Sequence, residues 1–234
     1  MKLSQINELS KLINNSKFID LSYTLEEGMP TWPTQARYSS TIYESYDYGD
    51  ESLHSRITLS EHTGTHIDAP KHFYKEGCSI DELNVNTIFS RGVKISAKFI
   101  EPKSLFTLKD LDRFEQENGE ISESDIVMFQ FGWDSKYGTY SNSKEYMKDW
   151  PGISEEVAVA LKEKKIAAVG CDTLCIDVYN SPTNPAHKVL LGNKIPIIEN
   201  IKNLDLISVY SYVIGLPNKF KNGSGSPIRL ISLN

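Results

Sequence analysis

The residues of this sequence best suited to chemistry form a histidine cluster. Three of the five histidines, His62, His66 and His72, fall between residues 62 and 72, and Asp68 lies among them. Neutral imidazole and carboxylate are common ligands of first-row metals, and a set without thiolate suits Zn²⁺, Mn²⁺ or Fe²⁺. The cluster therefore predicts a site for a divalent metal.

The spacing of the cluster indicates how the chain must run to bring these side chains onto one ion. Two histidines four residues apart can share a helix face, but the two threonines and Gly64 between them and the nearby Pro70 oppose a helix. In an extended chain, residues 62, 66 and 68 share a face, although a straight strand would separate the Cα atoms of His62 and His66 by about 13 Å. Because Gly64 has no Cβ and can adopt a positive φ, it can bend the chain around one ion, and Pro70 then ends the strand.

His72 lies on the same face of the chain but beyond the proline. There it could approach the metal without binding it, as a proton-transferring group, since an ordinary imidazole pKa near 6.5 allows proton exchange around neutral pH. The alternative for the whole cluster is a closed structural zinc site. Such sites are usually rich in cysteine, and a chain of this length does not need a metal in order to fold.

The composition describes a globular protein with little affinity for polyanions. The chain has 234 residues, 39% hydrophobic and 24% charged, which fits a single domain over residues 1–234. Its net charge of -6 argues against binding to nucleic acid or to an anionic membrane, so we expect a small-molecule substrate. Neither a signal peptide nor a membrane span is evident, and the three cysteines are expected as reduced thiols, so the predicted compartment is the cytoplasm.

Local patterns predict a largely β fold with a few helices. Leu3, Ile6 and Leu9 have helical spacing and predict a short amphipathic helix packed on the domain. Further helices are expected after Ser79, from its capping-box pattern, and after Thr107 and Ser154, whereas the polar, Tyr-rich segment 137–151 is expected as a surface loop. Strands are predicted at 18–24, 37–43, 55–62, 92–100, 125–133, 166–172, 205–215 and 226–233. They do not alternate regularly with the helices, which favours a β core with packed helices over a doubly wound sheet.

The string from His62 to His72 resembles a known signature, H-x-G-T-H-x-D-x-P-x-H, and matches it at every fixed position. The signature is that of the metal-dependent cyclase superfamily, which includes bacterial kynurenine formamidase and isatin hydrolase. The resemblance continues in Asn184-Pro-Ala-His187, in Ile-Pro-Ile-Ile-Glu199-Asn, in Gly170-Cys-Asp172-Thr with Asp177, and in the tail Gly225-Ser-Pro-Ile-Arg229. It implies an α/β fold, namely a compact single domain with a barrel-like central β core and packed outer helices (the swivelling β/β/α fold), and a homodimer.

The resemblance also implies roles for individual residues. His62, His66 and Asp68 would hold one metal, Asp68, His187 and Glu199 would hold a second, and His72 would be the catalytic acid–base group. By the same resemblance, some relatives work with a single metal and carry a neutral amide at the position of Glu199. Because a second cation needs negative charge around it, the carboxylate of Glu199 favours two divalent ions per chain, Zn or Mn.

Two further residues each have two interpretations. Trp32 lies between prolines, and by the resemblance its loop is close to the pocket, where it could stack on an aryl substrate or simply fill the edge of the core. Asp172 follows an apolar strand and could orient a ligand histidine through the other ring nitrogen, or could cap a turn. Cys171 and Cys175 are interpreted as buried thiols outside the site.

The resemblance implies hydrolysis of an amide or formamide bond by hydroxide generated at the metal. The first candidate is an arylformamidase that converts N-formylkynurenine to kynurenine and formate in tryptophan catabolism. A cyclic amide or lactone hydrolase similar to isatin hydrolase is the alternative. A lyase that uses the metal as a Lewis acid and a metal-binding protein without turnover are further alternatives, and nothing in the motif identifies the substrate beyond the scissile bond.

Overall fold

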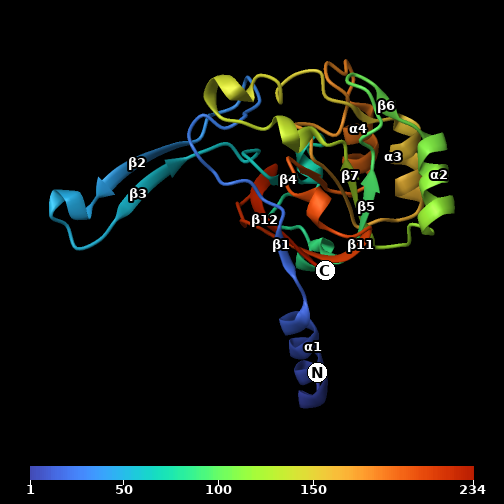
Figure 1. Ribbon diagram of the computed structural model, residues 1–234. Coiled ribbons are helices and arrows are strands. Elements are labelled where there is room, and N and C mark those ends of the chain that lie inside the picture. The colour runs from blue at the N-terminus through green and yellow to red at the C-terminus, as the bar shows by residue number, and fades with distance from the viewer.

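A computed structural model describes residues 1–234, and its centre is a β-sheet that closes on itself with helices packed outside (Figure 1). β12 closes the barrel because its first residues, Gly225–Pro227, pair with β4, while β1 (Phe18–Asp20) pairs with its last residues. The prediction of an α/β fold with a barrel-like β core and outer helices is confirmed. In pairing order, the seven barrel strands are β12 (Gly225–Leu233), β11 (Tyr210–Pro217), β5 (Phe89–Ser96), β7 (Ile126–Gln130), β9 (Ala168–Cys171), β10 (Ile197–Glu199) and β4 (His66–Asp68).

The barrel separates two hydrophobic cores. β5, β7, β9 and β10 are parallel, and the remaining pairings of the ring are antiparallel. In β7, Ile126 and Met128 belong to a cluster of 16 buried residues that includes side chains of the barrel strands, whereas Val127 and Phe129 belong to a cluster of 28 that includes residues of the helices. Since successive side chains of a strand point to opposite faces, β7 is buried on both faces, which explains its continuous apolar sequence.

Three helices cover one side of the barrel (Figure 1), namely α2 (Leu108–Asn118), α3 (Glu155–Glu163) and α4 (Pro185–Gly192). Thr107 forms a capping box with Asp110 at the start of α2, and the side chain of Ser154 accepts a hydrogen bond from Val157 N at the start of α3. Both predicted helices are therefore confirmed. No helix has the length and hydrophobicity that a membrane span would require.

The helix predicted after Ser79 is wrong, although one of the two contacts of a capping box forms. Ser79 N donates to Glu82 Oε2 at 3.1 Å, but the chain makes only a turn there. A short 3₁₀ helix begins at Val85 and β5 begins at Phe89, so too little chain is available for an α-helix. The hydrogen bond from Ser79 N to the Glu82 carboxylate therefore belongs to an isolated turn here.

Two elements project from the barrel (Figure 1). α1 (Leu3–Asn15) has no buried residue, so the prediction that it packs on the domain is wrong for the single chain. α1 is followed directly by β1, which pairs with β12, and the helix extends beyond the barrel from the start of this strand. The second element is the hairpin of β2 (Ser39–Glu44) and β3 (His54–Thr58), in which no residue of either strand is buried.

The segment 137–151 is less exposed than predicted. Tyr146 is fully buried, and its hydroxyl lies 3.0 Å from the carbonyl oxygen of Asp172 and 2.7 Å from Asn200 Oδ1. Trp150 is also buried, and the segment leads into β8 (Gly152–Ile153), which pairs with β6 (Leu105–Phe106). Its aromatic residues are part of the core. The polar residues around them made the segment resemble a surface loop in the sequence.

Candidate metal centre

Two neighbouring barrel strands place three of the predicted ligands on one face. β4 and β10 pair antiparallel, with His66 opposite Glu199 and Ile67 opposite Ile198. Both isoleucines point into the core of the barrel, so His66, Asp68 and Glu199 point to its outer side. All three polar side chains are buried.

Gly64 gives the chain the bend that the spacing of the histidines requires. Its φ is 64°, and a Cβ there would lie 2.6 Å from Leu25 Cδ2, which is too close for a larger residue. His62 therefore lies outside the strand, yet its Nδ1 is 2.6 Å from Asp68 Oδ1. The strand ends at Asp68, and Pro70 begins a short 3₁₀ helix, so the predicted bend and stop are both present.

His187 reaches the same centre from the first turn of α4. The carboxylate of Asp177 accepts hydrogen bonds from Ala186 N at 2.9 Å and His187 N at 3.1 Å, so it caps this helix. The same carboxylate lies 2.7 Å from His187 Nδ1 and holds the ring. One residue thus sets both the helix start and the direction of the imidazole.

Each of the three histidines uses one ring nitrogen to contact the protein outside the centre. His187 Nδ1 faces Asp177 at 2.7 Å, His66 Nδ1 faces the carbonyl of Gly64 at 2.8 Å, and His62 Nε2 faces Ser224 Oγ at 2.9 Å. The other nitrogen of each ring points to Asp68. Metal-binding histidines are usually oriented in this way, by a carboxylate, carbonyl or other polar group on the second nitrogen.

The separations between the donor atoms fit a bound cation. His66 Nε2 lies 3.4 Å from Asp68 Oδ1 and 3.6 Å from Glu199 Oε2, and His187 Nε2 lies 3.4 Å from Asp68 Oδ2 and 3.4 Å from Glu199 Oε1. Two ligands about 2.1 Å from one ion are roughly 3.0 to 3.4 Å apart in octahedral or tetrahedral coordination. These residues therefore fit a first-row divalent ion.

The electrostatics of the cluster also favour a cation. Burial and the charge of Asp68 raise the pKa of Glu199 to about 8. Burial opposes ionisation of Asp68 as well, but the charge of His62 and hydrogen bonds from the histidines hold the pKa of Asp68 well below its usual range. Burial would lower the pKa of His187, yet its hydrogen bonds to Asp177 and Asp68 outweigh burial and raise that pKa to about 10. A divalent ion would offset the repulsion between the two buried carboxylates.

A pocket of about 310 Å³ opens over this centre. His72 is in its wall, and its ring centre is 4.1 Å from that of His62 and 6.4 Å from that of His187. Burial lowers the pKa of His72 to about 4, below the ordinary imidazole value assumed from the sequence, so the ring is neutral at pH 7. Trp32, 40% exposed, also lines the pocket. The pocket thus contains every residue of the predicted site except Asp172.

Asp172 caps a turn and does not orient a ligand histidine. Its carboxylate accepts hydrogen bonds from the backbone N–H groups of Phe131, Gly132 and Trp133, at 2.7 to 3.1 Å. It contacts no histidine, because the loop after β7 occupies both of its oxygens. Burial raises the pKa of this carboxyl to about 7. The residue that orients a histidine is Asp177, and its position ten residues before His187 gave no local signal for that role.

A closed mixed barrel with a buried histidine–carboxylate cluster in a pocket on its outer side has the architecture of a metal-binding enzyme. The sequence profile described as "Cyclase: Putative cyclase" matches residues 19–178, and the chain belongs to this family.

Individual relatives agree with this assignment. The chain is 28% identical over 222 residues to a kynurenine formamidase of Bacillus thuringiensis (strain Al Hakam), which covers 94% of this chain and 98% of the relative. Among solved structures, isatin hydrolase A from Labrenzia aggregata, bound to benzyl benzoate, has a TM-score of 0.88 and 27% identity over 98% of both chains. A structure described as a potential metal-dependent hydrolase with cyclase activity has a TM-score of 0.75 and 23% identity, over 93% of this chain and 98% of that one, and supports the fold.

Proposed function

We propose that this protein is a metal-dependent hydrolase that cleaves the amide bond of an aryl formamide, with N-formylkynurenine as the first candidate substrate. The observation that carries the proposal is the pocket in which His72 stands beside a buried cluster of metal donors. The relatives named kynurenine formamidase support the substrate class, since they align over 94% of the chain. The proposed metal ligands are His62, His66, Asp68, His187 and Glu199.

The arrangement of the pocket supports a division of tasks. A divalent ion bound by the cluster would supply Lewis acidity and lower the pKa of water at the site. His72, neutral at pH 7, can accept a proton in the pocket and return it to the leaving nitrogen. Trp32, at the wall of the pocket, can stack on an aryl ring and hold the carbonyl toward the cluster. The chain's residues thus position the substrate and move the proton.

Hydrolysis of a cyclic amide is the second candidate. The likeness to isatin hydrolase A over 98% of both chains favours it, and the same pocket residues would act on a ring-closed amide. Metal binding without turnover has less support, because a purely structural site gains nothing from an additional imidazole in an open pocket.

We predict a higher kcat/KM for formanilide than for isatin or a simple lactone in one metal-loaded preparation. In an anilide the nitrogen lone pair is shared with the ring, so the carbonyl is more electrophilic and the leaving amine is weakly basic. Trp32→Ala should lower kcat/KM more for formanilide than for an aliphatic formamide, because only the aryl substrate loses stacking. A preference for isatin would replace the formamidase proposal with the second candidate, and no turnover of any substrate would contradict the hydrolase.

We also propose two ions per chain, of Zn or Mn. The support is that Asp68 Oδ1 faces His62 and His66 whereas its Oδ2 faces His187, an arrangement in which one carboxylate can bridge two ions. Elemental analysis of the reconstituted protein should give close to two ions per chain, and Glu199→Gln should reduce this number to one because a carboxylate is lost. A single ion at saturating metal, unchanged in Glu199→Gln, would contradict two-metal binding.

We further propose that two copies form a homodimer through the projecting elements. Ile42 and Ile57 are 50% and 54% exposed and lie on the same face of the hairpin, and a lone two-stranded hairpin is only marginally stable in water. α1 likewise exposes an apolar stripe without a partner, and a helix of 13 residues is marginal by itself. The hairpin segment 39–58 carries four acidic residues and one arginine, whereas segment 1–17 carries three lysines and one glutamate. Their charges are therefore complementary.

Light scattering after gel filtration should give the mass of a dimer, and Ile57→Asp should shift the equilibrium to monomer. Burial of one isoleucine contributes about 2 kcal/mol, and a two-fold interface contains it twice, so dissociation should increase by roughly 10³-fold. Val85→Asp is the matched control, because Val85 is 68% exposed but lies outside both projecting elements. A monomeric wild-type protein at micromolar concentration would refute the dimer.

A further inference from the structure

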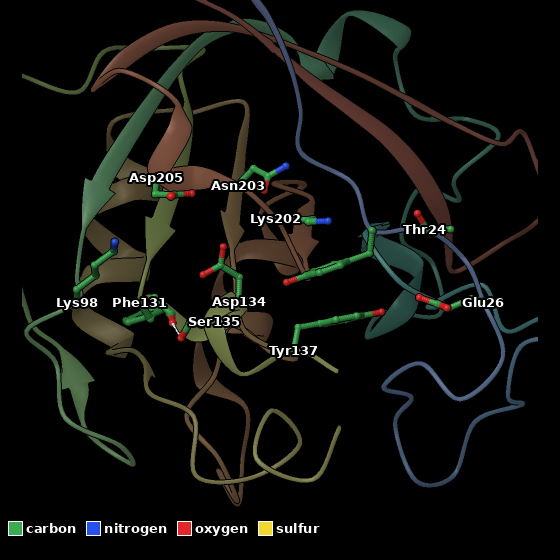
Figure 2. Close-up of a pocket in the computed structure, with 12 residues that line it drawn as sticks. Thr24, Glu26, Lys98, Phe131, Asp134, Ser135, Tyr137, Lys202, Asn203 and Asp205 are labelled. Atoms are coloured by element: carbon green, nitrogen blue, oxygen red, sulfur yellow. Dashed lines mark hydrogen bonds between the residues drawn. The ribbon is translucent and has the colours of Figure 1, made fainter. Parts of the chain in front are cut away.

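A second cavity, of about 750 Å³, is lined by none of the residues of the metal centre. Figure 2 shows the residues that line it. It is bounded by the segments that follow β1, β5, β7 and β10, and it shares no lining residue with the pocket over the metal centre. Neither the proposed hydrolysis nor the proposed dimer assigns a role to it. A role for this cavity therefore does not depend on the proposed hydrolysis or on the proposed dimer.

Charged side chains of both signs face this cavity without forming ion pairs. Lys98 and Lys202 line it together with the three carboxylates Glu26, Asp134 and Asp205, and none of these five side chains takes part in a salt bridge anywhere in the structure. Figure 2 shows the carboxylate of Asp134 between the two lysines. Burial raises the pKa of Asp134, and the charge of Asp205 adds to the rise. The cavity thus holds cations and anions apart, each available to an external partner.

Tyr23 adds a buried polar group that also lacks a partner. It lines the cavity at 8% exposure, and its hydroxyl has no hydrogen bond. Its ring stacks on that of Tyr137 at a centroid distance of 3.6 Å, and the hydroxyl of Tyr137 is likewise buried without a partner. Since buried hydroxyls in native proteins are nearly always hydrogen-bonded, these two groups offer hydrogen bonds to a polar molecule in the cavity.

We propose that this cavity binds a small zwitterion of the α-amino acid class, with its carboxylate at Lys202 and its ammonium at Asp134. A simple anion would pair only with the lysines and would leave the carboxylates without a counter-charge. A simple cation would pair only with the carboxylates and would leave the lysines without one. A molecule that carries both charges satisfies both groups, and charge-assisted hydrogen bonds are the stronger kind. The aromatic rings of Tyr23, Tyr137 and Phe131 offer apolar contact for its side chain.

Calorimetric titration of the metal-loaded protein with three matched compounds tests this assignment. L-Phenylalanine carries both charges, 3-phenylpropionate only the carboxylate, and phenethylamine only the ammonium. L-Phenylalanine should bind with saturation at millimolar or lower concentration, and each of the others should bind about tenfold more weakly or worse, since each loses a charge-assisted contact. Equal affinity for all three compounds, or no saturable binding of L-phenylalanine because water or a partner subunit fills the cavity, would overturn the proposal.

Substitutions in each of the two pockets test where L-phenylalanine binds. Lys202→Met and Asp134→Asn should each weaken L-phenylalanine binding by about tenfold or more, and circular dichroism should show an unchanged fold because both side chains are only partly buried. Glu199→Gln should leave the affinity for L-phenylalanine unchanged, since Glu199 lines only the other pocket. Loss of binding in Glu199→Gln with retention in Lys202→Met would place the ligand in the catalytic pocket and overturn the proposal.

Discussion

Replacement of His72 by alanine is expected to lower kcat by about 10² to 10⁴, the usual contribution of a positioned acid–base group, while the metal content stays unchanged. The physical reason is its position. His72 lies in the wall of the pocket, with its ring centre 4.1 Å from that of His62. One of its ring nitrogens is within 4.8 Å of an Asp68 oxygen, but the ion-pair contacts of the buried carboxylates are to the other three histidines. Elemental analysis and steady-state kinetics on the same preparation would test this separation of binding from turnover.

His72→Gln is the matched variant, because an amide keeps polar atoms in the pocket but does not exchange a proton near neutral pH. Its kcat should be as low as that of His72→Ala. Recovery of activity in His72→Gln would show that the residue only fills space or donates a hydrogen bond, and loss of metal in either variant would show that His72 is a ligand.

The pH dependence adds a third readout. A general base is active when deprotonated, so its activity rises with pH through its pKa, which for His72 is lowered to about 4 by burial. A rise in kcat/KM near pH 7 would therefore belong to another group, and it should persist in the residual activity of His72→Ala. Disappearance of that rise in the variant would assign it to His72.

The geometry of the site between His62 and Pro70 could be predicted from the sequence, and the reason is physical. Residue types within this run determine its backbone path. Glycine at position 64 permits the positive φ, and proline at position 70 ends the strand that stops at Asp68. The approach of Glu199 to His66 depends on the pairing of two strands far apart in the chain, which no local pattern encodes. It was accessible only through the family resemblance.

The errors of sequence interpretation share one cause, which is that tertiary contacts decide the outcome. The apolar stripe of α1 correctly indicated a helix but not what it packs against. Asp172 and Asp177 both follow apolar or small residues, and only the folded chain shows that one caps the loop after β7 whereas the other caps α4 and holds His187. Helix α4 itself is eight residues long and begins at a proline, so its pattern was too short to predict.

The second large effect is expected at Asp68, whose replacement by asparagine should weaken metal binding by roughly 10² to 10³ and abolish turnover. A four-ligand structural zinc site binds its ion with a free energy of about 10 to 16 kcal/mol, and one ligand accounts for roughly a quarter of this. Competition with a chelator at fixed pH would measure the affinity.

Asp177→Asn is the matched control for Asp68→Asn, because both carboxylates face His187, Asp68 Oδ2 at 3.4 Å from Nε2 and Asp177 Oδ2 at 2.7 Å from Nδ1. Asp177 only orients the ring, so its loss should weaken binding by about 10- to 100-fold, and thermal unfolding would report any effect on α4. Because the charge of Asp68 helps to raise the pKa of Glu199, Asp68→Asn should also lower that pKa in the metal-free protein. Wild-type metal affinity in Asp68→Asn, with weaker binding in Asp177→Asn, would exclude Asp68 as a ligand.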